Sequence, residues 1–428
     1  MNKVKVFQIG LGSFGRYGFE KFVEMEKNLP EADVELVGVA DSDLERLRSA
    51  EKFADVHDLE LETFRNASEM YSRAEEVKHE SGDDTEILVY DAGPTESHSD
   101  HIYESLQRGF YHLAEKPSSM KRDEHLREKR LAEDRNVIWK VDFIERENPV
   151  VKKTLELLGD EEIGEIKVFR ESCIGVEKLI NPVKRLGVKG GDILDKMVHE
   201  VYVLDFLEEV NGEFDLELED AGAEYFMPKD FDSQKLMSLT GGYTTEITQK
   251  TATAMTEASF SSNGTNVELN SSWLGTSEGA MRYAKKVREI NGDQVLERDT
   301  VEEDEKAHLN EEARFFVIDG SRKLLGDMLH ERLYDLESGE EIELRDYMHD
   351  QLYRVLESSV LEAAGISENP VSEKETDVFM NTIFDIRDEV VERDDFREAL
   401  ESGKEKLDSL VVTDGKILEN EESERIAG

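Results

Sequence analysis

The stretch that decides the fold lies at the start of the chain and reads VKVFQIGLGSFG, residues 4–15. Its apolar first half predicts a strand, G-x-G-x-x-G follows, and residues 16–25 predict a helix. In such a unit Gly10 makes the tight turn, Gly12 lets a pyrophosphate approach the backbone, and Gly15 lets the helix pack on the sheet. The N-terminus of the helix offers N–H groups and a positive dipole end to phosphates. The stretch therefore predicts a dinucleotide-binding turn.

A second predicted strand, residues 34–40, ends at Asp41. An acidic side chain at this position accepts hydrogen bonds from the hydroxyls of the adenosine ribose. The spacing from Gly15 exceeds the usual one of about 20 residues, because residues 28–33 form a longer loop between helix and strand. We expect the following residues to contact a dinucleotide: Gly10, Gly12, Ser13, Phe14, Gly15 and Asp41.

The composition is that of a strongly acidic protein that can still bury a core. The chain has 428 residues, of which 38% are hydrophobic, and its 100 acidic and 53 basic residues give a net charge of −47. The acids are spread through every predicted element. Such a surface repels itself in dilute buffer, and molar salt screens it, because the Debye length there is about 3 Å. We expect a halophile-like acidic proteome and no nucleic-acid or anionic-membrane partner, since phosphate binding needs a concentrated basic face.

Cysteine use and hydropathy indicate the compartment. Cys173 is the only cysteine, which excludes an intrachain disulfide or a cysteine-rich zinc site. We find no signal-peptide apolar region, and no apolar run approaches the roughly 20 residues that span a bilayer. These features predict a cytoplasmic protein with no membrane partner. His98 and His101 have a spacing that could suit a metal, but no carboxylate and histidine cluster accompanies them, so no metal site is predicted.

The pattern along the chain predicts an α/β protein with two domains and an extension. Residues 1–148 alternate strands and helices, which is typical of a Rossmann domain with a doubly wound parallel sheet. Residues 149–391 predict an α+β domain for substrate binding and oligomerisation, with a large open, mostly antiparallel sheet. Within it, Gly190 and Gly191 open a predicted apolar helix at residues 192–207. Residues 392–428 form a charged, acidic C-terminal extension.

A further turn of the first domain follows a predicted strand. The strand at residues 86–90 leads to Pro94, Thr95 and then His98. Ligands of open parallel sheets bind outside the carboxyl ends of the strands. We therefore expect these three residues to lie near the cofactor.

Four separated segments resemble, in the same order, the Gfo/Idh/MocA family of NAD(P)-dependent sugar and cyclitol oxidoreductases. They are the glycine turn with Asp41, the triplet Glu115-Lys116-Pro117, FIERENP at residues 143–149, and GGDILDKMVH at residues 190–199. The resemblance covers residue 3 to about residue 390. It implies that Glu115, Lys116 and Arg146 contact the cofactor. It also implies that the open sheet of the second domain mediates self-association, giving a homodimer or a homotetramer.

The chemistry of alcohol oxidation suits these residue types. A base with a pKa near the working pH must take the hydroxyl proton as hydride leaves carbon, and histidine meets this need. Asp195 and His199 are four positions apart in the predicted helix and would share one face. A lysine beside the NAD⁺ ring loses proton affinity by like-charge repulsion. The resemblance implies that His199 is the general acid/base, Lys116 the hydrogen-bonding and relay partner, and Asp195 the orienting residue and substrate-hydroxyl ligand.

Asp41 and Asp43 favour NAD over NADP as the cofactor. A 2′-phosphate would meet two carboxylates there, with no evident arginine partner in the sequence. The expected substrate is a small polyhydroxylated molecule, namely a sugar, a sugar acid or a cyclitol.

Three positions depart from the family pattern and leave alternatives open. Lys189 replaces the first of three glycines, Met197 stands where the family has glycine, and Tyr202 stands where an aspartate often follows the histidine. One alternative is an NAD-dependent glycosidase, in which oxidation is transient and no NADH accumulates. The other is a non-catalytic NAD-binding sensor that keeps the fold.

Overall fold

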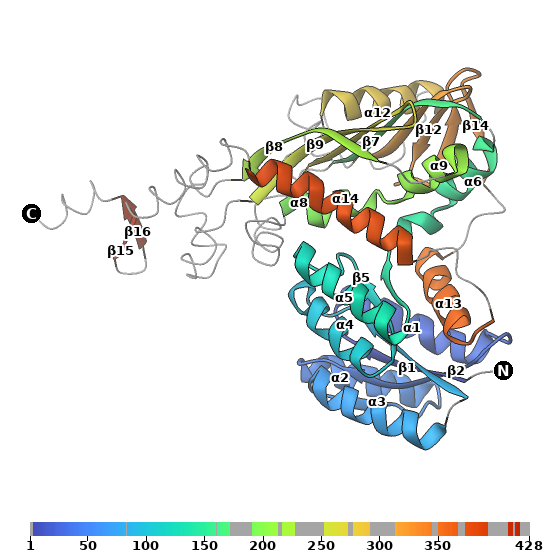
Figure 1. Cartoon of the computed structure of the whole chain (residues 1–428), viewed down its shortest axis with the longest axis vertical. Helices are drawn as coiled ribbons and strands as arrows, with labels where there is room; N and C mark the ends of the chain where they lie inside the picture. The colour runs from blue at the N-terminus through green and yellow to red at the C-terminus, as the bar shows by residue number, and fades with distance from the viewer. Residues whose placement is uncertain are drawn as a thin grey trace, which may run out of the picture. The chain divides into compact units, whose positions relative to one another are not determined.

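The structure is a computed structural model with two compact units (Figure 1). Unit 1 comprises Met1–Pro149 and Tyr347–Asn381, and unit 2 comprises Val150–Asp346 and Thr382–Gly428. The structure describes residues 3–82, 84–159, 161–171, 191–212, 216–226, 252–272, 277–291, 313–344, 350–366, 373–392, 410–413 and 416–419. Each unit is described by itself.

Unit 1 contains a fully parallel, six-stranded sheet in the order β3-β2-β1-β4-β5-β6. Its strands are β1 (Lys3–Ile9), β2 (Asp33–Ala40), β3 (Glu62–Phe64), β4 (Thr85–Asp91), β5 (Tyr111–Glu115) and β6 (Trp139–Asp142). This is the strand order of dinucleotide-binding doubly wound sheets, which reverses between β1 and β4. The predicted Rossmann sheet is confirmed.

Helices cover both faces of this sheet, because its central strands are apolar on both sides. Val4 and Val6 join a buried cluster with α1 and α2, and Phe7 and Ile9 join a second cluster with α3. The helices of unit 1 are α1 (Ser13–Asn28), α2 (Leu44–Val56), α3 (Ala67–Ser81), η1 (Thr95–Ser97), α4 (His98–Gln107), α5 (Arg122–Arg135), η2 (Ile144–Glu147) and α13 (Gln351–Ala363).

Helix α13 comes from far along the chain and completes the core of unit 1. Leu352, Leu356 and Val360 are buried in the same cluster as α1. Asp350 caps α13 by accepting from the backbone N–H of Tyr353 at 3.1 Å, and it also accepts a 2.6 Å hydrogen bond from the hydroxyl of Tyr17. The segment around Asp350 is therefore tied to α1 by both apolar packing and polar contacts.

Unit 2 contains an eight-stranded sheet in the order β14-β13-β12-β11-β7-β10-β9-β8. Only β7 and β10 pair in parallel, so the predicted open, mostly antiparallel sheet is confirmed. Its strands are β7 (Ile163–Glu171), β8 (Glu217–Phe226), β9 (Ala252–Ser262), β10 (Thr265–Ser272), β11 (Ala313–Gly320), β12 (Lys323–Asp327), β13 (Arg332–Asp335) and β14 (Glu340–Ile342). The remaining elements are α6 (Pro149–Leu158), α8 (Gly191–Asp195), η3 (Met197–His199), α9 (Tyr202–Asn211), α12 (Glu278–Asn291), β15 (Leu410–Thr413) and β16 (Lys416–Glu419). Helix α14 (Glu373–Glu392) belongs to unit 1 up to Asn381 and to unit 2 from Thr382.

Helices lie on both faces of the sheet of unit 2. On β11, Phe316 contacts Tyr202 and Phe206 of α9, whereas Phe315 belongs to the buried cluster that includes Ala280 of α12. Successive side chains of a strand point to opposite faces. Helix α9 therefore covers one face of the sheet and α12 covers part of the other (Figure 1).

The structure corrects one predicted element of unit 2. The expected single helix at residues 192–207 is three pieces, α8, η3 and α9, separated at Lys196 and after His199. The backbone N–H of His199 bonds to the carbonyl of Lys196 at 2.9 Å, a spacing of three residues rather than four. Cys173, Lys189, Gly190 and most of the predicted extension at residues 392–428 lie outside the described residues. No helix in the described ranges has the length and apolar character needed to cross a membrane.

The charge balance predicts that stability depends on salt. Even if each of the 53 basic residues were paired with one of the 100 acids, 47 acids would remain without a partner. We expect the melting temperature to rise by about 5–15 °C between 0.1 and 2 M KCl, because screening removes surface repulsion. Thermal melts across a KCl series measure this. A melting temperature independent of KCl would show that local contacts compensate the acids.

Candidate cofactor and substrate sites

The glycine turn in unit 1 has the backbone geometry that the sequence predicts. Gly10 has φ +85°, and a Cβ there would lie 2.4 Å from the carbonyl oxygen of Ala92. A Cβ on Gly15 would lie 2.3 Å from the carbonyl oxygen of Gly10. Around Gly12, by contrast, the nearest atom is Nη1 of Arg46 at 4.0 Å. Close packing therefore requires glycine at positions 10 and 15, because a side chain there would clash with the backbone. Gly12, in contrast, has open space beside its backbone.

This open space lies at the N-terminus of α1, the end of a helix at which anions bind. Gly12 is the N-cap of α1, and no side chain caps its first turn. The amide of Gln8 holds the turn from below by donating to the carbonyls of Gly10 at 2.8 Å and Gly15 at 2.5 Å. Ser13 and Phe14 are exposed on the first turn. An uncapped helix N-terminus with an open glycine suits an anionic, backbone-bound group.

Asp41 lies beside the glycine turn, as predicted for the ribose ligand. Its Oδ2 accepts from the backbone N–H of Leu11 at 2.7 Å, and its Oδ1 accepts from that of Asp43 at 2.8 Å. Arg46 lies 3.5 Å from Oδ2 of Asp41 and 3.6 Å from Oδ2 of Asp43. The expectation that no arginine accompanies these acids is therefore wrong, because the first turn of α2 brings Arg46 back to them.

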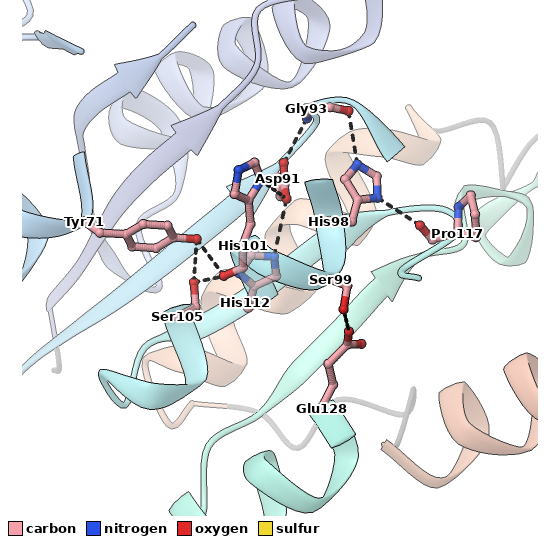
Figure 2. A network of polar contacts seen from close by, with 10 residues as sticks. All are labelled: Tyr71, Asp91, Gly93, His98, Ser99, His101, Ser105, His112, Pro117 and Glu128. Carbon is pink, nitrogen blue, oxygen red and sulfur yellow. Dashed lines mark hydrogen bonds and ion pairs between the residues drawn. The ribbon is translucent and has the colours of Figure 1, made fainter. Parts of the chain in front are cut away.

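A buried polar network fixes the turn after β4 (Figure 2). Oδ1 of Asp91 accepts from the backbone N–H of Gly93 at 2.9 Å, and Oδ2 lies 2.8 Å from Nδ1 of His101. Burial opposes ionisation of Asp91, but the neighbouring His98, His101 and His112 lower its pKa to about 2. The predicted cofactor residues Pro94 and Thr95 follow this turn, where Pro94 is exposed and Thr95 begins η1. The ionised Asp91 therefore anchors the backbone that packs on Gly10.

The Asp91 and His101 pair predicts a pH-dependent stability for unit 1. Burial opposes protonation of His101, but Asp91 raises its pKa above the ordinary value. The pair's contribution, about 1–3 kcal/mol, is present below the ordinary histidine pKa of about 6.5 and is lost as pH rises through the raised value. It is also lost in acid, as pH falls through the pKa of Asp91, about 2.

Urea unfolding followed by Trp139 fluorescence, in a Trp273→Phe background, measures this effect. The free-energy difference between the parent and His101→Gln should be largest near pH 5–6 and should shrink towards pH 9. A difference that stays constant across this range would contradict the assignment.

The loop that carries Lys116 follows β5 at the same carboxyl edge. Lys116 is half-buried, and its peptide bond to Pro117 is cis. Burial raises the pKa of both Glu115 and Asp142, which are neighbours in the β5–β6 register. The hydroxyl of Tyr90 donates to Oε1 of Glu115 at 2.8 Å. Glu115 thus fixes the base of the Lys116 loop, and the predicted cofactor residue Arg146 lies half-buried on η2.

In unit 2, two buried residues anchor the segment that carries Asp195 and His199. Asp192 on α8 accepts from the hydroxyl of Thr256 at 3.0 Å and from that of Ser271 at 2.6 Å. Lys196 donates from Nζ to the carbonyl of Ser272 at 2.6 Å. Asp192 thus bonds to both β9 and β10, and Lys196 bonds to β10, so the short helices are held against the sheet.

Asp195 and His199 are both half-buried, at the ends of α8 and η3. They do not share one continuous helix, because the break at Lys196 separates them. Met197 and Tyr202, which depart from the family pattern, are both at most 1% exposed. Tyr202 packs edge-on against Phe206. Both side chains are therefore part of the buried core of unit 2.

The structure brings the glycine turn together with Asp41, and His98 together with the Lys116 loop. Lys116 belongs to unit 1, whereas Asp195 and His199 belong to unit 2, so their grouping stays a prediction.

Sequence reasoning missed Gln8, Asp91, Arg46 and Asp192. A polar residue inside an apolar strand, or at its end, was the available signal for Gln8 and Asp91. In the described ranges, no group of three histidine, cysteine or acidic residues could hold a metal ion.

A model of a known family matches the N-terminal part of the chain. Residues 4–143 match the model of the Gfo/Idh/MocA family, described as an oxidoreductase family with an NAD-binding Rossmann fold. This segment is therefore similar to the NAD-binding Rossmann domain of an oxidoreductase family. No curated protein shows significant sequence similarity to the chain.

Solved structures share the fold over most of the chain. UDP-N-acetylglucosamine 3-dehydrogenase GnnA from Acidithiobacillus ferrooxidans is 18% identical, with a TM-score of 0.59, and the match covers 91% of this chain and 98% of that one. The WlbA dehydrogenase from Bordetella pertussis, solved with NADH and UDP-GlcNAcA, is 15% identical with a TM-score of 0.62, covering 91% and 95%. A point mutant of the 3-ketoreductase KijD10 from Actinomadura kijaniata, solved with TDP-benzene and NADP, is 15% identical with a TM-score of 0.58, covering 91% and 98%.

Proposed function

We propose that the protein is an NAD-dependent dehydrogenase that oxidises a secondary hydroxyl of a sugar, a sugar acid or a cyclitol. The observation that carries this proposal is the open space at Gly12 on the uncapped N-terminus of α1, beside Asp41. These groups suit the pyrophosphate and ribose of a dinucleotide. Lys116 lies at the carboxyl edge of the same sheet, where ligands of doubly wound folds bind.

The proposed reaction converts the alcohol to a ketone. Bound NAD⁺ supplies the acceptor for the hydride that leaves carbon. His199 takes the hydroxyl proton, because a base must remove it as the hydride departs. Lys116 donates a hydrogen bond to the same oxygen, and Asp195 orients the substrate through a second hydroxyl. The anchors of Asp192 and Lys196 support these roles by fixing the segment between α8 and η3.

We expect NAD⁺ to bind at least about tenfold more tightly than NADP⁺. A 2′-phosphate carries about −1.5 to −2 charge and would meet Asp41 and Asp43, which Arg46 only partly compensates. Fluorescence titration of both cofactors measures the ratio. The Arg46→Ala variant should weaken NADP⁺ further and change NAD⁺ affinity less, since only NADP⁺ carries this phosphate. Equal affinities, or tighter NADP⁺, would contradict the assignment.

The compartment and the assembly state complete the proposal. We propose a cytoplasmic enzyme that forms a homodimer or a homotetramer through the sheet of unit 2. Helix α12 covers part of the sheet face that carries Phe315. We therefore expect two copies of the chain to meet on the rest of that face, where β9 and β10 carry the polar side chains of Glu257, Ser259 and Glu268. Light scattering in molar KCl gives the mass of the assembly. A monomer at all concentrations would contradict this part of the proposal.

A substrate screen tests the proposed activity. The enzyme in molar KCl is mixed with NAD⁺ and a panel of sugars, sugar acids, cyclitols and nucleotide sugars, and absorbance of the reduced nicotinamide is followed. Nucleotide sugars are included because the names of two similar structures contain them. Accumulating NADH supports a dehydrogenase. Glycoside cleavage without NADH would support the glycosidase, and bound NAD⁺ without turnover would support the sensor.

A further inference from the structure

His98 contacts two loops at the carboxyl edge of the sheet in unit 1. It is the first residue of α4 and is 1% exposed. Its Nδ1 lies 2.9 Å from the carbonyl oxygen of Pro117, and its Nε2 lies 3.1 Å from the carbonyl oxygen of Gly93. Figure 2 shows the ring between these two partners. The imidazole thus links the Lys116 loop to the turn that packs on Gly10.

Both hydrogen bonds require both ring nitrogens to be protonated. A carbonyl oxygen can only accept, and a neutral imidazole has one N–H. The neutral ring would therefore set a lone pair against one of the two carbonyls. Only the imidazolium satisfies both contacts, and as a cation it forms the stronger, charge-assisted bonds.

The charged groups around His98 suit an imidazolium. On β4, Asp91 is buried and has a pKa of about 2, because the nearby histidines, His98 first among them, outweigh its burial. On β5, Glu115 lies close enough for His98 to affect its pKa. Burial lowers the pKa of His112 on β5 to about 3, so that ring is neutral and does not compete for Asp91. On α4 itself, His101 shares Asp91 at 2.8 Å.

We propose that His98, as an imidazolium, is a positioning residue that holds the Lys116 loop against the turn after β4. Lys116 then meets the nicotinamide and the substrate oxygen at one fixed place. This inference rests on the proposed function, because the placement of Lys116 affects turnover only if the protein oxidises a hydroxyl. Loss of the two His98 hydrogen bonds, which we call the clamp, leaves the cofactor contacts of the glycine turn in place and lets Lys116 move. A displacement of about 1 Å at a reacting group can reduce rate by about 10²-fold.

A double-mutant cycle tests how His98 acts. His98→Phe keeps a ring and removes both N–H groups, and we expect kcat to fall about 10- to 100-fold, with NAD⁺ affinity changing much less. In a Lys116→Met background the same change should cost less than about twofold, since the residue it positions is gone. His98→Gln, whose amide can still donate, should recover part of the loss. An equal loss in both backgrounds would overturn the proposal.

The matched control is Ser99→Ala. Ser99 is the next residue of α4, is buried and donates to Glu128, and has no contact with Gly93 or Pro117 in the described structure. It should lower the melting temperature without changing kcat. A fall in kcat as large as that of His98→Phe would show that general loosening of α4 explains the effect, and would overturn the proposal.

A second measurement needs no turnover. Histidine labelled with ¹⁵N gives separate ring signals for the 10 histidines of the chain, and the His98 signal is the one lost in His98→Gln. We expect both nitrogens of His98 to be protonated in the folded protein, as its two carbonyl contacts require. One protonated and one bare nitrogen would overturn the clamp. If the protein were not a dehydrogenase, the substrate screen would fail while this signal still reported the imidazolium, so the two failures are distinguishable.

Discussion

The His199→Ala variant should turn over substrate about 10²- to 10⁴-fold more slowly, the usual contribution of a positioned acid/base. Its NAD⁺ affinity should stay nearly unchanged, because the proposed pyrophosphate and ribose contacts come from the glycine turn and Asp41 in unit 1. Steady-state turnover across pH and a separate NAD⁺ titration measure the two quantities. Near-normal turnover at every pH would show that His199 is not the base.

Two further variants sharpen this test. Lys116→Ala should also lower turnover, and the loss in the double variant should be less than the product of the single losses if both groups serve one proton path. His79→Ala removes an exposed histidine of α3 and should leave turnover unchanged. Fully multiplicative losses would mean that Lys116 and His199 act in independent steps.

The Gly12→Ala variant should fold normally and lose about 10- to 100-fold in NAD⁺ affinity, or about 1.4–2.7 kcal/mol. A Cβ at this position meets nothing nearer than Nη1 of Arg46 at 4.0 Å. The new methyl group would therefore not strain the protein, but it would occupy the space in which the pyrophosphate approaches the backbone. A melting curve and an NAD⁺ titration check both halves of this expectation.

Two other glycines give matched controls for this effect. Gly10→Ala should destabilise unit 1 outright, because its Cβ would lie 2.4 Å from the carbonyl oxygen of Ala92 at φ +85°. Gly222→Ala on β8 meets nothing within 4 Å and should change neither stability nor NAD⁺ affinity by much. If Gly12→Ala bound NAD⁺ as tightly as Gly222→Ala, the cofactor would not lie over this turn.

The local signals of unit 1 are strong enough in the sequence to predict its sheet. The strand β1 (Lys3–Ile9) buries apolar side chains on both faces, and the glycines at 10, 12 and 15 permit the backbone conformation and close packing that the turn requires. The packing of α13 on α1 could not be predicted in this way. It depends on apolar residues such as Leu356, more than 300 positions along the chain, and periodicity shows that a helix is amphipathic without showing which surface it covers.

In the candidate sites, too, the sequence predicts the residues that local patterns mark and misses those that the folded chain brings together. Asp41 could be predicted because it ends a strand after a glycine turn, but Arg46 returns to it only through the geometry of the first turn of α2. The break between Asp195 and His199 was hidden, because the apolar residues that recur through residues 192–207 also fit a single helix. The hydrogen bonds of Asp192 to β9 and of Lys196 to β10 stabilise the interrupted helix. Contacts between residues so far apart in the chain produce no local sequence pattern from which the interruption could be predicted.

The most direct test of the central claim follows a labelled hydrogen. The substrate found in the screen is prepared with deuterium on the carbon that bears the oxidised hydroxyl, and the reduced cofactor formed in molar KCl is analysed by mass spectrometry. Direct hydride transfer predicts that each NADH molecule carries one deuterium and that one ketone forms for each NADH. Deuterium-free NADH, or substrate consumed while all the cofactor stays as NAD⁺, would contradict the assignment as a dehydrogenase.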